Sequence, residues 1–278
     1  MAKLDRLGWA DGMSFNSFGV RLGIRVNDAS ILKSITELLP PESRPTSEPV
    51  VDHLYSLIGS VTKPDSKVRP LNLAYWNLDR IARSRGLQEM LEAFASHVQL
   101  TVAEYSPRRV FVHAGVVGWN NRAIVIPGRS YSGKTTLVAE LIRAGATYYS
   151  DEYAIFDERG RVHPYSRPLA IRDSGSHVSN KVTADEIGAR TGSKPLPVGL
   201  VVSMSFKAGA QWRPRRLSQG KGMLELLANT VSVRSRPQMA MNVLPKTLQS
   251  AQVLKGIRGE AAAVVESILA HCDGVATR

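Results

Sequence analysis

The sequence contains a single cysteine, Cys272, and this scarcity excludes several classes of protein. One thiol supports neither an intramolecular disulfide framework nor a cysteine-based zinc site. The six histidines show no HxH or HxxxH spacing, so the sequence does not indicate a metal site built from paired histidines. No stretch approaches about 18 consecutive apolar residues, which argues against a transmembrane helix. The charged N-terminus lacks the apolar segment of a signal peptide, and we therefore expect a cytoplasmic protein.

Neither disorder nor a repetitive fibre fits the composition, because 43% of the 278 residues are hydrophobic and 22% are charged. At roughly 100–200 residues per domain, the chain can form one large domain or one domain with a smaller attachment. Lysine and arginine outnumber aspartate and glutamate, 36 to 24, which gives a formal net charge of +12. This excess favours anionic partners, namely nucleotides, phosphoproteins, nucleic acid or acidic lipid, without choosing among them.

The N-terminal part of the chain carries mixed strand and helix patterns. Alternating apolar positions predict a half-buried strand over residues 18–26. A helix follows, with Asn27 or Asp28 as its N-terminal cap. Further apolar patterns predict a strand over 50–61 and an amphipathic helix over 87–104.

The pattern changes near residue 105, after which short apolar runs alternate with turns and helices. Strands are expected at 110–112, 123–126, 148–149, 153–156, 168–172 and 198–206, and helices at 137–142, 218–229 and 260–271. The polar residues 173–196 predict a loop. The turn at 118–122 predicts a hairpin, which a regular doubly wound domain lacks. We therefore expect an α/β fold with a mixed sheet over 106–278 and an N-terminal α+β segment over 1–105.

Residues 128–135 read Gly-Arg-Ser-Tyr-Ser-Gly-Lys-Thr and fit the P-loop (Walker A) pattern G-x-x-x-x-G-K-[ST] between a strand and a helix. Its two glycines permit backbone conformations that bring loop amides onto phosphate oxygens at a helix N-terminus. Lys134 supplies a cation for the β- and γ-phosphates, and the Thr135 hydroxyl suits Mg²⁺. The alternative is a Gly/Ser-rich turn with an incidental lysine. The candidate nucleotide-binding residues are Gly128, Arg129, Ser130, Tyr131, Ser132, Gly133, Lys134, Thr135 and Thr136.

Two adjacent acids, Asp151 and Glu152, follow the expected helix and a short strand. A P-loop kinase needs a carboxylate near its metal and often one near the nucleophile. At a strand end, neighbouring side chains point to opposite faces, so one acid could reach the metal while the other is held structurally. The alternative is a solvated acidic turn. His113, which ends an apolar run before the hairpin, is either a hydrogen-bonded core residue or a catalytic group.

These residues resemble the catalytic domain of HPr kinase/phosphorylase and its relatives, in the P-loop group that also contains phosphoenolpyruvate carboxykinase. The similar order of residues runs through Val112-His113-Ala114-Gly115, Ile126-Pro127-Gly128, Gly133-Lys134-Thr135, Gly145 and Ser150-Asp151-Glu152. The match covers residues 108–175 well and the rest of the C-terminal half weakly, and residues 1–100 contribute nothing to it. The resemblance implies a P-loop core of the HPr-kinase/carboxykinase type.

The resemblance also implies ATP and Mg²⁺ as cofactors, and a role for each matching residue. Lys134 would bind the β- and γ-phosphates, and Asp151 would take the proton from an attacking serine hydroxyl. Glu152 matches an acid associated with the metal, and His113 matches a histidine near the transferred phosphate. The candidate catalytic residues are therefore Asp151, Lys134 and His113, and the candidate metal ligands are Thr135, Asp151 and Glu152.

The chain also departs from the family pattern. HPr kinase has two aspartates where this chain has Asp151 and Glu152, so the second carboxylate stands on a longer side chain. The Arg-Gly-x-Gly loop of the bifunctional enzyme has no counterpart between residues 173 and 200. Phosphorolysis of a phosphoserine, and HPr itself as the substrate, are therefore disfavoured.

Other signals are weaker. Residues 180–182 begin like the guanine signature of GTPases, but Thr183 replaces its aspartate, which disfavours a guanine-specific GTPase. His-Arg-Asp and Asp-Phe-Gly are absent, which argues against a protein-kinase fold. Arg167 and Arg172 flank a strand and are candidates to face the phosphates. A basic cluster that could hold an acidic substrate or nucleic acid, or simply form a solvated loop, comprises Lys207, Trp212, Arg213, Arg215 and Arg216.

The sequence therefore predicts an ATP- and Mg²⁺-dependent phosphotransferase that acts on a hydroxyl, with serine of a protein or peptide as the leading acceptor. The expected partners are a nucleoside triphosphate and that acceptor, whereas nucleic acid is disfavoured. The sequence is compatible with a homo-oligomer but shows no surface for self-association. Two alternatives would use the same loop. One is a nucleotide-binding regulatory or assembly protein without transfer activity, and the other is a small-metabolite kinase.

Overall fold

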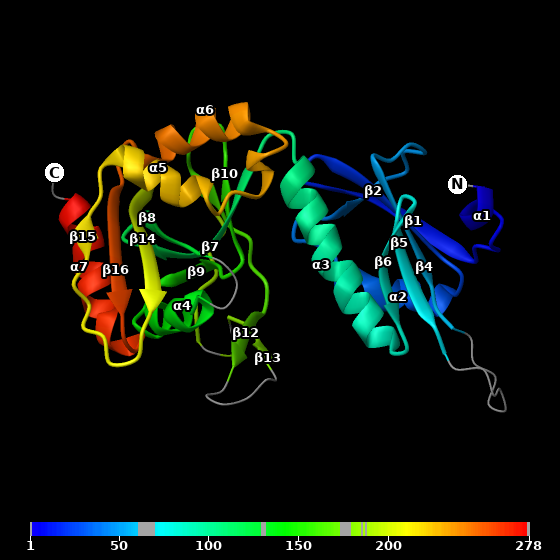
Figure 1. The fold of residues 1–278 in the computed structure, drawn as a ribbon, viewed down its shortest axis with the longest axis horizontal. Helices are drawn as coiled ribbons and strands as arrows, with labels where there is room; N and C mark the ends of the chain where they lie inside the picture. Colours follow the sequence, from blue (N-terminus) through cyan, green and yellow to red (C-terminus); the bar gives the residue numbers. More distant parts are fainter. Residues whose placement is uncertain are drawn as a thin grey trace. The chain divides into compact units, whose positions relative to one another are not determined.

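The structure is a computed structural model, and it describes residues 2–60, 70–128, 132–172, 179–184, 186 and 188–276. The chain divides into two compact units, residues 1–108 and 109–278. Figure 1 labels the helices and strands of both units. Three residues of the expected phosphate-binding loop, Arg129, Ser130 and Tyr131, lie outside the described residues.

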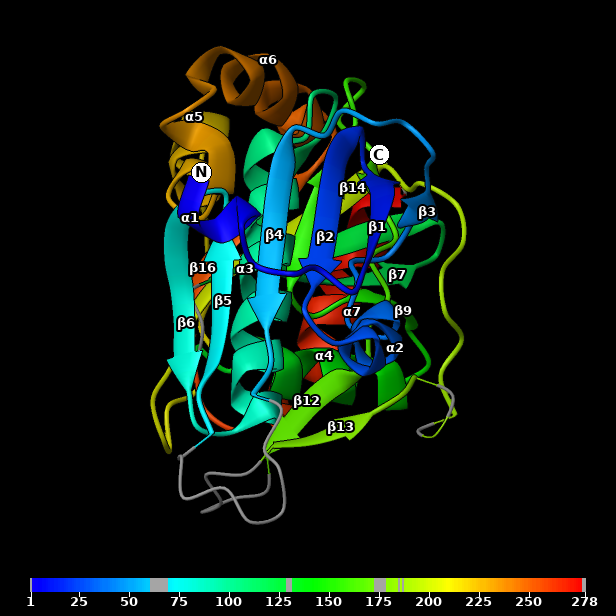
Figure 2. The ribbon, with the colours of Figure 1, turned by 90° about the vertical axis from the view of Figure 1, so that its right-hand side faces the viewer.

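A six-stranded mixed sheet forms the first unit, and Figure 2 shows its strands side by side. Their order across the sheet is β3 (Arg44–Pro45), β1 (Asp11–Ser17), β2 (Val20–Val26), β4 (His53–Ile58), β5 (Asn72–Trp76) and β6 (Asp79–Ser84). β2 and β4 are parallel, and the other neighbouring pairs are antiparallel. The helices of this unit are α1 (Ala2–Asp5), α2 (Ala29–Thr36) and α3 (Leu87–Tyr105).

Helices α2 and α3 pack against this sheet and bury apolar side chains of the first unit. The Asp28 carboxylate accepts a hydrogen bond from the Ser30 N–H at 2.9 Å and caps α2, as predicted. α3 packs against β5 and β6. Its Phe94 ring meets the Tyr55 ring of β4 edge to face, with the centroids 5.2 Å apart.

The sequence predicts only part of this unit. The strand expected over 18–26 begins at Val20, because Phe18 and Gly19 take left-handed φ angles of 49° and 86° in the turn after β1. The expected helix over 87–104 is confirmed as α3. β1 and β6 escape prediction because their sequences are too polar to show apolar alternation.

An eight-stranded mixed sheet forms the second unit, which confirms the mixed sheet expected for the C-terminal part. Along it lie β11 (Val162–His163), β10 (Tyr153–Phe156), β7 (Val110–Trp119), β8 (Arg122–Pro127), β14 (Val198–Phe206), β16 (Gln252–Arg258) and β15 (Arg215–Arg216), with β9 (Thr147–Ser150) also paired to β7. β8, β14 and β16 are parallel, whereas β7 is antiparallel to β8 and β10. A small separate sheet pairs β12 (Leu169–Arg172) with β13 (Ser179–Val182).

Helices cover both faces of the larger sheet (Figure 1). α4 (Lys134–Arg143) and α7 (Val265–Ala276) pack on one face, and α5 (Gln219–Leu227) and α6 (Pro237–Leu248) pack on the other. Successive residues of β8 point to opposite faces, so Ile126 packs with Leu137 of α4 while Val125 packs with Leu244 of α6. α4 is thereby held directly on the strand that precedes the expected phosphate-binding loop.

The β7–β8 hairpin leads into β8, which ends at Pro127 just before the expected phosphate-binding loop. Asn120 and Asn121 form its tight turn with φ angles of 45° and 60°, which asparagine tolerates better than most residues. The hairpin expected from the sequence is therefore confirmed. Because β8, β14 and β16 are parallel, their carboxyl ends at Pro127, Phe206 and Arg258 lie at the same edge.

The prediction of a loop over 173–196 is wrong in part, because β13 lies within that range and pairs with β12, which precedes it. Residues 173–178, 185 and 187 of the range lie outside the described residues. The helix expected over 260–271 is α7, which begins at Val265 after a short 3-10 turn. α6 escapes prediction because Pro245 lies in its interior, where proline normally argues against a helix. Within the described ranges, no helix is both long and apolar enough to cross a membrane.

Candidate functional site

Glycines shape the described ends of the loop that follows β8. The Gly128 N–H donates to the His113 carbonyl oxygen of β7 at 3.1 Å, which fixes the loop to the sheet edge. A Cβ at Gly128 would lie 2.6 Å from Ser132 Oγ, so a larger residue would push the two ends of the loop apart. Gly133 has a left-handed φ of 82°, and α4 begins at the next residue, Lys134. The N–H groups of this first turn point away from the helix and form a favourable place for an anion.

The residues after Gly133 occupy the first turn of α4. Lys134 is only 8% exposed, whereas Thr136 is exposed. Burial lowers the pKa of Lys134, and the charges of Glu152 and Asp151 work against this decrease. The lysine is thus a largely buried cation that has carboxylates within electrostatic reach.

Asp151, which follows β9, contacts the same first turn of α4 through its carboxylate. Thr135 Oγ1 donates a hydrogen bond to Asp151 Oδ2 at 3.2 Å. The Tyr148 hydroxyl lies 3.1 Å from Asp151 Oδ1 and 2.8 Å from the Arg167 carbonyl oxygen, and it can donate to either. Asp151 is 9% exposed. Burial raises its pKa, while the hydrogen bonds from Tyr148 and Thr135 limit the increase.

The two acids directly follow the end of β9, as the sequence suggested, and lie in the bend that joins β9 to β10. The Ser150 hydroxyl oxygen holds this bend by accepting hydrogen bonds from the N–H groups of Glu152 and Tyr153, at 3.1 and 3.0 Å. Because the acids lie in this bend, strand alternation alone does not set the directions of their side chains, and the expectation of opposite directions stays a prediction. Both carboxylates raise the pKa of Lys134, which places both within its electrostatic reach.

His113 and Glu152 face each other beside this lysine. The His113 Nδ1 atom lies 3.8 Å from Glu152 Oε1, and the His113 ring lies 4.7 Å from the Tyr153 ring between centroids. Burial and the charge of Lys134 lower the pKa of His113, which favours the neutral ring near neutral pH. Burial raises the pKa of Glu152, and Lys134 and Arg167 oppose that increase.

A cation, a hydroxyl, an imidazole and two carboxylates therefore gather where β8 leads into α4. We call this group the Lys134 cluster; its members are His113, Lys134, Thr135, Asp151 and Glu152. The Thr135 and Asp151 oxygen atoms, 3.2 Å apart, are the hard donors that Mg²⁺ prefers. Such an arrangement can bind a phosphorylated ligand and accept a proton from a hydroxyl.

Other residues contact or approach this cluster. Tyr148 reaches Asp151 from β9, and Arg258 Nη2 donates to the Gly133 carbonyl oxygen at 2.9 Å. Sequence reasoning missed both, because neither belongs to a motif. Tyr148 reaches Asp151 through the bend after β9, and Arg258 reaches Gly133 through the pairing of β8, β14 and β16. No sequence signal pointed to Arg258, because β16 was not among the strands expected from the sequence. Arg167 lies close enough to Glu152 to lower its pKa, whereas the Arg172 side chain lies outside the described residues.

The single aromatic of the basic cluster serves packing. Trp212 packs against the buried residues between the sheet and helices α4 and α7. A Cβ on Gly256 of β16 would lie 2.8 Å from the Trp212 ring, so the ring lies directly on that strand. It is therefore poorly placed to stack on a nucleic-acid base, which would require an accessible ring face.

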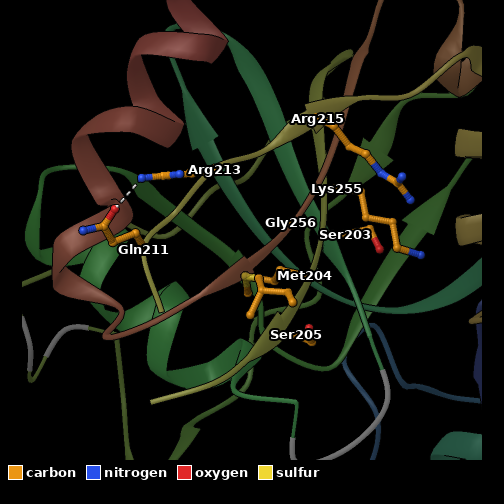
Figure 3. Close-up of a pocket in the computed structure, with 9 residues that line it drawn as sticks. Ser203, Met204, Ser205, Gln211, Arg213, Arg215, Lys255 and Gly256 are labelled. Atoms are coloured by element: carbon orange, nitrogen blue, oxygen red, sulfur yellow. Dashed lines mark hydrogen bonds between the residues drawn. The ribbon is translucent and has the colours of Figure 1, made fainter. Parts of the chain in front are cut away.

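Two arginines of the basic cluster line an open cavity of about 770 Å³ over β14 and β16 (Figure 3). Arg215 and Lys255 extend to the same side, whereas Arg213 turns towards Gln211 and donates to its side-chain oxygen at 3.0 Å. Lys255 already donates to the Glu225 carboxylate at 2.5 Å. No member of the Lys134 cluster lines this cavity. The side-chain chemistry therefore favours the Lys134 cluster over this cavity as the functional site.

Comparison with protein-family models gives no match, and comparison with curated proteins gives none either. Among solved structures, the chain is similar to the Hpr(Ser) kinase/phosphatase from Coxiella burnetii, with 13% sequence identity and a TM-score of 0.35. The match covers 60% of this chain and 97% of that chain. At this TM-score the likeness is a distant one, and the function proposed below is inferred from the chain's own residues.

Proposed function

We propose that the chain is an ATP- and Mg²⁺-dependent phosphotransferase that moves the γ-phosphate to a hydroxyl, with serine of a protein or peptide as the leading acceptor. The observation that carries the proposal is the hydrogen bond from Thr135 Oγ1 to Asp151 Oδ2, at 3.2 Å. It joins the P-loop motif to an acid that the motif itself does not contain. A protein that only binds nucleotide needs a metal ligand, whereas transfer to a hydroxyl also needs a group that orients or deprotonates it.

The nucleotide's phosphates are proposed to bind at the N-terminus of α4. Gly128 and Gly133 permit the backbone to approach an anion closely, and Lys134 adds a buried positive charge at the same place. A cation in a partly dry site interacts with phosphate more strongly than one in water. The proposed nucleotide-binding set keeps the eight residues of the sequence motif and the threonine after it, namely Gly128, Arg129, Ser130, Tyr131, Ser132, Gly133, Lys134, Thr135 and Thr136.

Mg²⁺ fits the donor atoms of this cluster. The Thr135 hydroxyl and the carboxylates of Asp151 and Glu152 are oxygen ligands, and Mg²⁺ commonly takes one or two carboxylates together with substrate phosphates. When bound, the ion would neutralise negative charge on the phosphates. The hydrogen bond between Thr135 and Asp151 already brings two of these donors together.

Asp151 is the proposed general base. In the transfer, the acceptor oxygen bonds to the γ-phosphorus, the bond from that phosphorus to the β–γ bridging oxygen breaks, and ADP leaves. Asp151 takes the proton of the acceptor hydroxyl. Burial raises the pKa of Asp151 above that of an exposed aspartate, which makes it a better proton acceptor, and the hydroxyls of Thr135 and Tyr148 orient it. His113, with Glu152 beside it, is proposed to lie near the transferred phosphate.

Incubation with γ-labelled ATP and Mg²⁺ tests this function directly. Candidate serine peptides and free serine are offered in parallel, and a reaction with excess chelator serves as the control. Label in a peptide is the expected result, and it should disappear with the chelator. Label only in a small hydroxyl compound would identify a small-metabolite kinase. ATP binding without label in any acceptor would contradict transfer and support a regulatory nucleotide-binding protein.

A further inference from the structure

Arg258, the last residue of β16, is a buried arginine in direct contact with the end of the phosphate-binding motif. It is 2% exposed. Its Nη2 atom donates to the Gly133 carbonyl oxygen at 2.9 Å, and its Nη1 atom donates to the Gly259 carbonyl oxygen at 2.8 Å. The contact with Gly133 is close, because a Cβ there would lie only 2.4 Å from Nη2. The guanidinium also lies over the Phe206 ring, with its Cζ atom 5.3 Å from the ring centroid.

The charge of Arg258 has no anionic partner at close range. Both hydrogen-bond acceptors are neutral main-chain carbonyls, and no carboxylate of the described residues forms an ion pair with it. Its Nε–H is buried and has no partner among the described atoms. The Glu260 side chain nearby is exposed. Proteins usually pair a buried charge, because an unpaired one is strongly destabilising.

Local structure does not account for this arginine. The Gly133 carbonyl oxygen already accepts a hydrogen bond from the Leu137 N–H at 3.2 Å in the first turn of α4, so it does not need a second donor. A cation at the N-terminus of a helix also opposes the helix dipole. Lys134 places another positive charge at the same turn. The position is therefore electrostatically unfavourable until an anion arrives.

We propose that Arg258 is a second cation of the phosphate site, whose charge is compensated by the polyphosphate of the bound ligand. The inference rests on the proposed function and extends it, because it names the phosphate chain as the part of the ligand that this residue recognises. Arg258 is too buried for broad contact with a ligand. It is thus a positioning residue, which lies against the Gly133 carbonyl oxygen and adds positive potential where the phosphates bind.

The test compares Arg258→Met, which removes the charge, and Arg258→Lys, which keeps it, with the wild type. Arg216→Met, at an exposed arginine of β15, is the matched control. Melting temperature and affinity are measured with Mg²⁺ alone, with ATP and with inorganic tripolyphosphate.

Without ligand, Arg258→Met should melt at or above the wild-type temperature, because it relieves an unpaired buried charge. Its affinity for ATP and for tripolyphosphate should fall about 10- to 150-fold, the usual range for one charged contact. Arg258→Lys should fall between the two, and Arg216→Met should match the wild type.

Two results would overturn the inference while leaving the proposed function intact. The first is an Arg258→Met variant that binds ATP and tripolyphosphate as tightly as the wild type. The second is an Arg258→Lys variant that, like Arg258→Met, melts far below the wild type without ligand, because the guanidinium would then serve the fold and not the ligand's charge. A wild-type protein that binds neither ligand would instead overturn the proposed function, and this inference with it.

Discussion

At the scale of single residues, the proposed function depends on a carboxylate that is nearly buried. Asp151 is 9% exposed, and the hydroxyls of Thr135 and Tyr148 both reach it. These contacts fix the direction of the carboxylate, while burial raises its pKa. A general base must be both oriented and available for a proton, and this environment suits Asp151 to the proposed role.

Replacing Asp151 by asparagine separates binding from transfer. Asparagine keeps the shape and can still accept a hydrogen bond from Thr135, so ATP affinity should stay near the wild-type value. It cannot take the acceptor's proton, and the transfer rate should fall by about 10²- to 10⁴-fold. The measurement is the initial rate of label transfer from γ-labelled ATP at saturating ATP. Asp79→Asn, at an exposed position of β6, is the control. An Asp151→Asn rate equal to that of the wild type would assign the base elsewhere.

The sequence could identify the residues of this site whose roles follow from a short motif. The glycines, Lys134 and Thr135 stand at fixed offsets within residues 128–135, so their neighbourhood is encoded locally. Arg258 is 125 residues from Gly133, and only the parallel pairing of β8, β14 and β16 brings the two together. Tyr148 reaches Asp151 because a bend follows β9, which apolar periodicity does not reveal.

At the scale of elements, the site depends on how closely α4 lies on β7. A Cβ at Gly115 of β7 would lie 2.6 Å from Val138 Cγ2 and 3.7 Å from the Lys134 Cβ of α4. The absence of a side chain at this glycine therefore lets the helix approach the strand. The local patterns predicted both elements, but their separation is a tertiary property that no periodicity encodes.

Gly115→Ala should push α4 away from β7. Overpacking of this kind typically destabilises a protein by about 1–3 kcal/mol, and a displaced helix should also weaken ATP binding. Gly220→Ala in α5 is the matched control, because a Cβ there meets no atom within 4 Å. Urea denaturation and ATP titration of both variants give the answer. Equal stability of Gly115→Ala and Gly220→Ala would show that the helix and strand are not in tight contact.

The β10–β11 hairpin supplies a prediction about pH. The Asp157 carboxylate in its turn accepts hydrogen bonds from the N–H groups of Arg159 and Arg161, from the Arg161 guanidinium and from His163 Nε2. Burial alone would raise the pKa of Asp157, but these hydrogen bonds outweigh it and hold the pKa below its ordinary value. The ionised carboxylate therefore stabilises the folded state above the unfolded pKa, near 3.8, and this contribution is lost as pH falls through the lower folded pKa.

Asp157→Asn should reveal this dependence. At pH 7 the variant should be less stable than the wild type by about 1–3 kcal/mol. The reason is that the N–H donors around residue 157 no longer have a charged acceptor. The difference should shrink as pH falls below about 4, where the wild-type carboxylate also begins to lose its charge. Denaturant melts of both proteins between pH 7 and pH 3 measure it. A difference that stays constant over this range would mean that the charge of Asp157 contributes nothing.

At the scale of the whole molecule, the proposed site belongs to one unit. Every residue of the Lys134 cluster lies in residues 109–278, as do Tyr148 and Arg258. That unit also has buried apolar clusters on both faces of its sheet. The sequence predicted a change of pattern near residue 105, because the hairpin and the motif follow it, but it assigned no role to the residues before.

Residues 109–278 produced alone should therefore fold and bind ATP. A domain with its own core can in principle fold independently, and we expect an affinity within about threefold of that of the full chain. Circular dichroism establishes that the fragment is folded, and an ATP titration then compares the two proteins. A folded fragment that fails to bind ATP would place part of the nucleotide site in the first unit.

Calorimetric titration of ATP with Mg²⁺ into the wild type and Lys134→Met tests whether the phosphates bind at the N-terminus of α4. Methionine preserves the buried stem of the side chain but removes the charge proposed to bind the β- and γ-phosphates. We expect the wild type to bind ATP and Lys134→Met, with an unchanged circular dichroism spectrum, to bind it about 10- to 150-fold more weakly. Equal affinity in the two proteins would mean that the phosphates bind somewhere other than the N-terminus of α4.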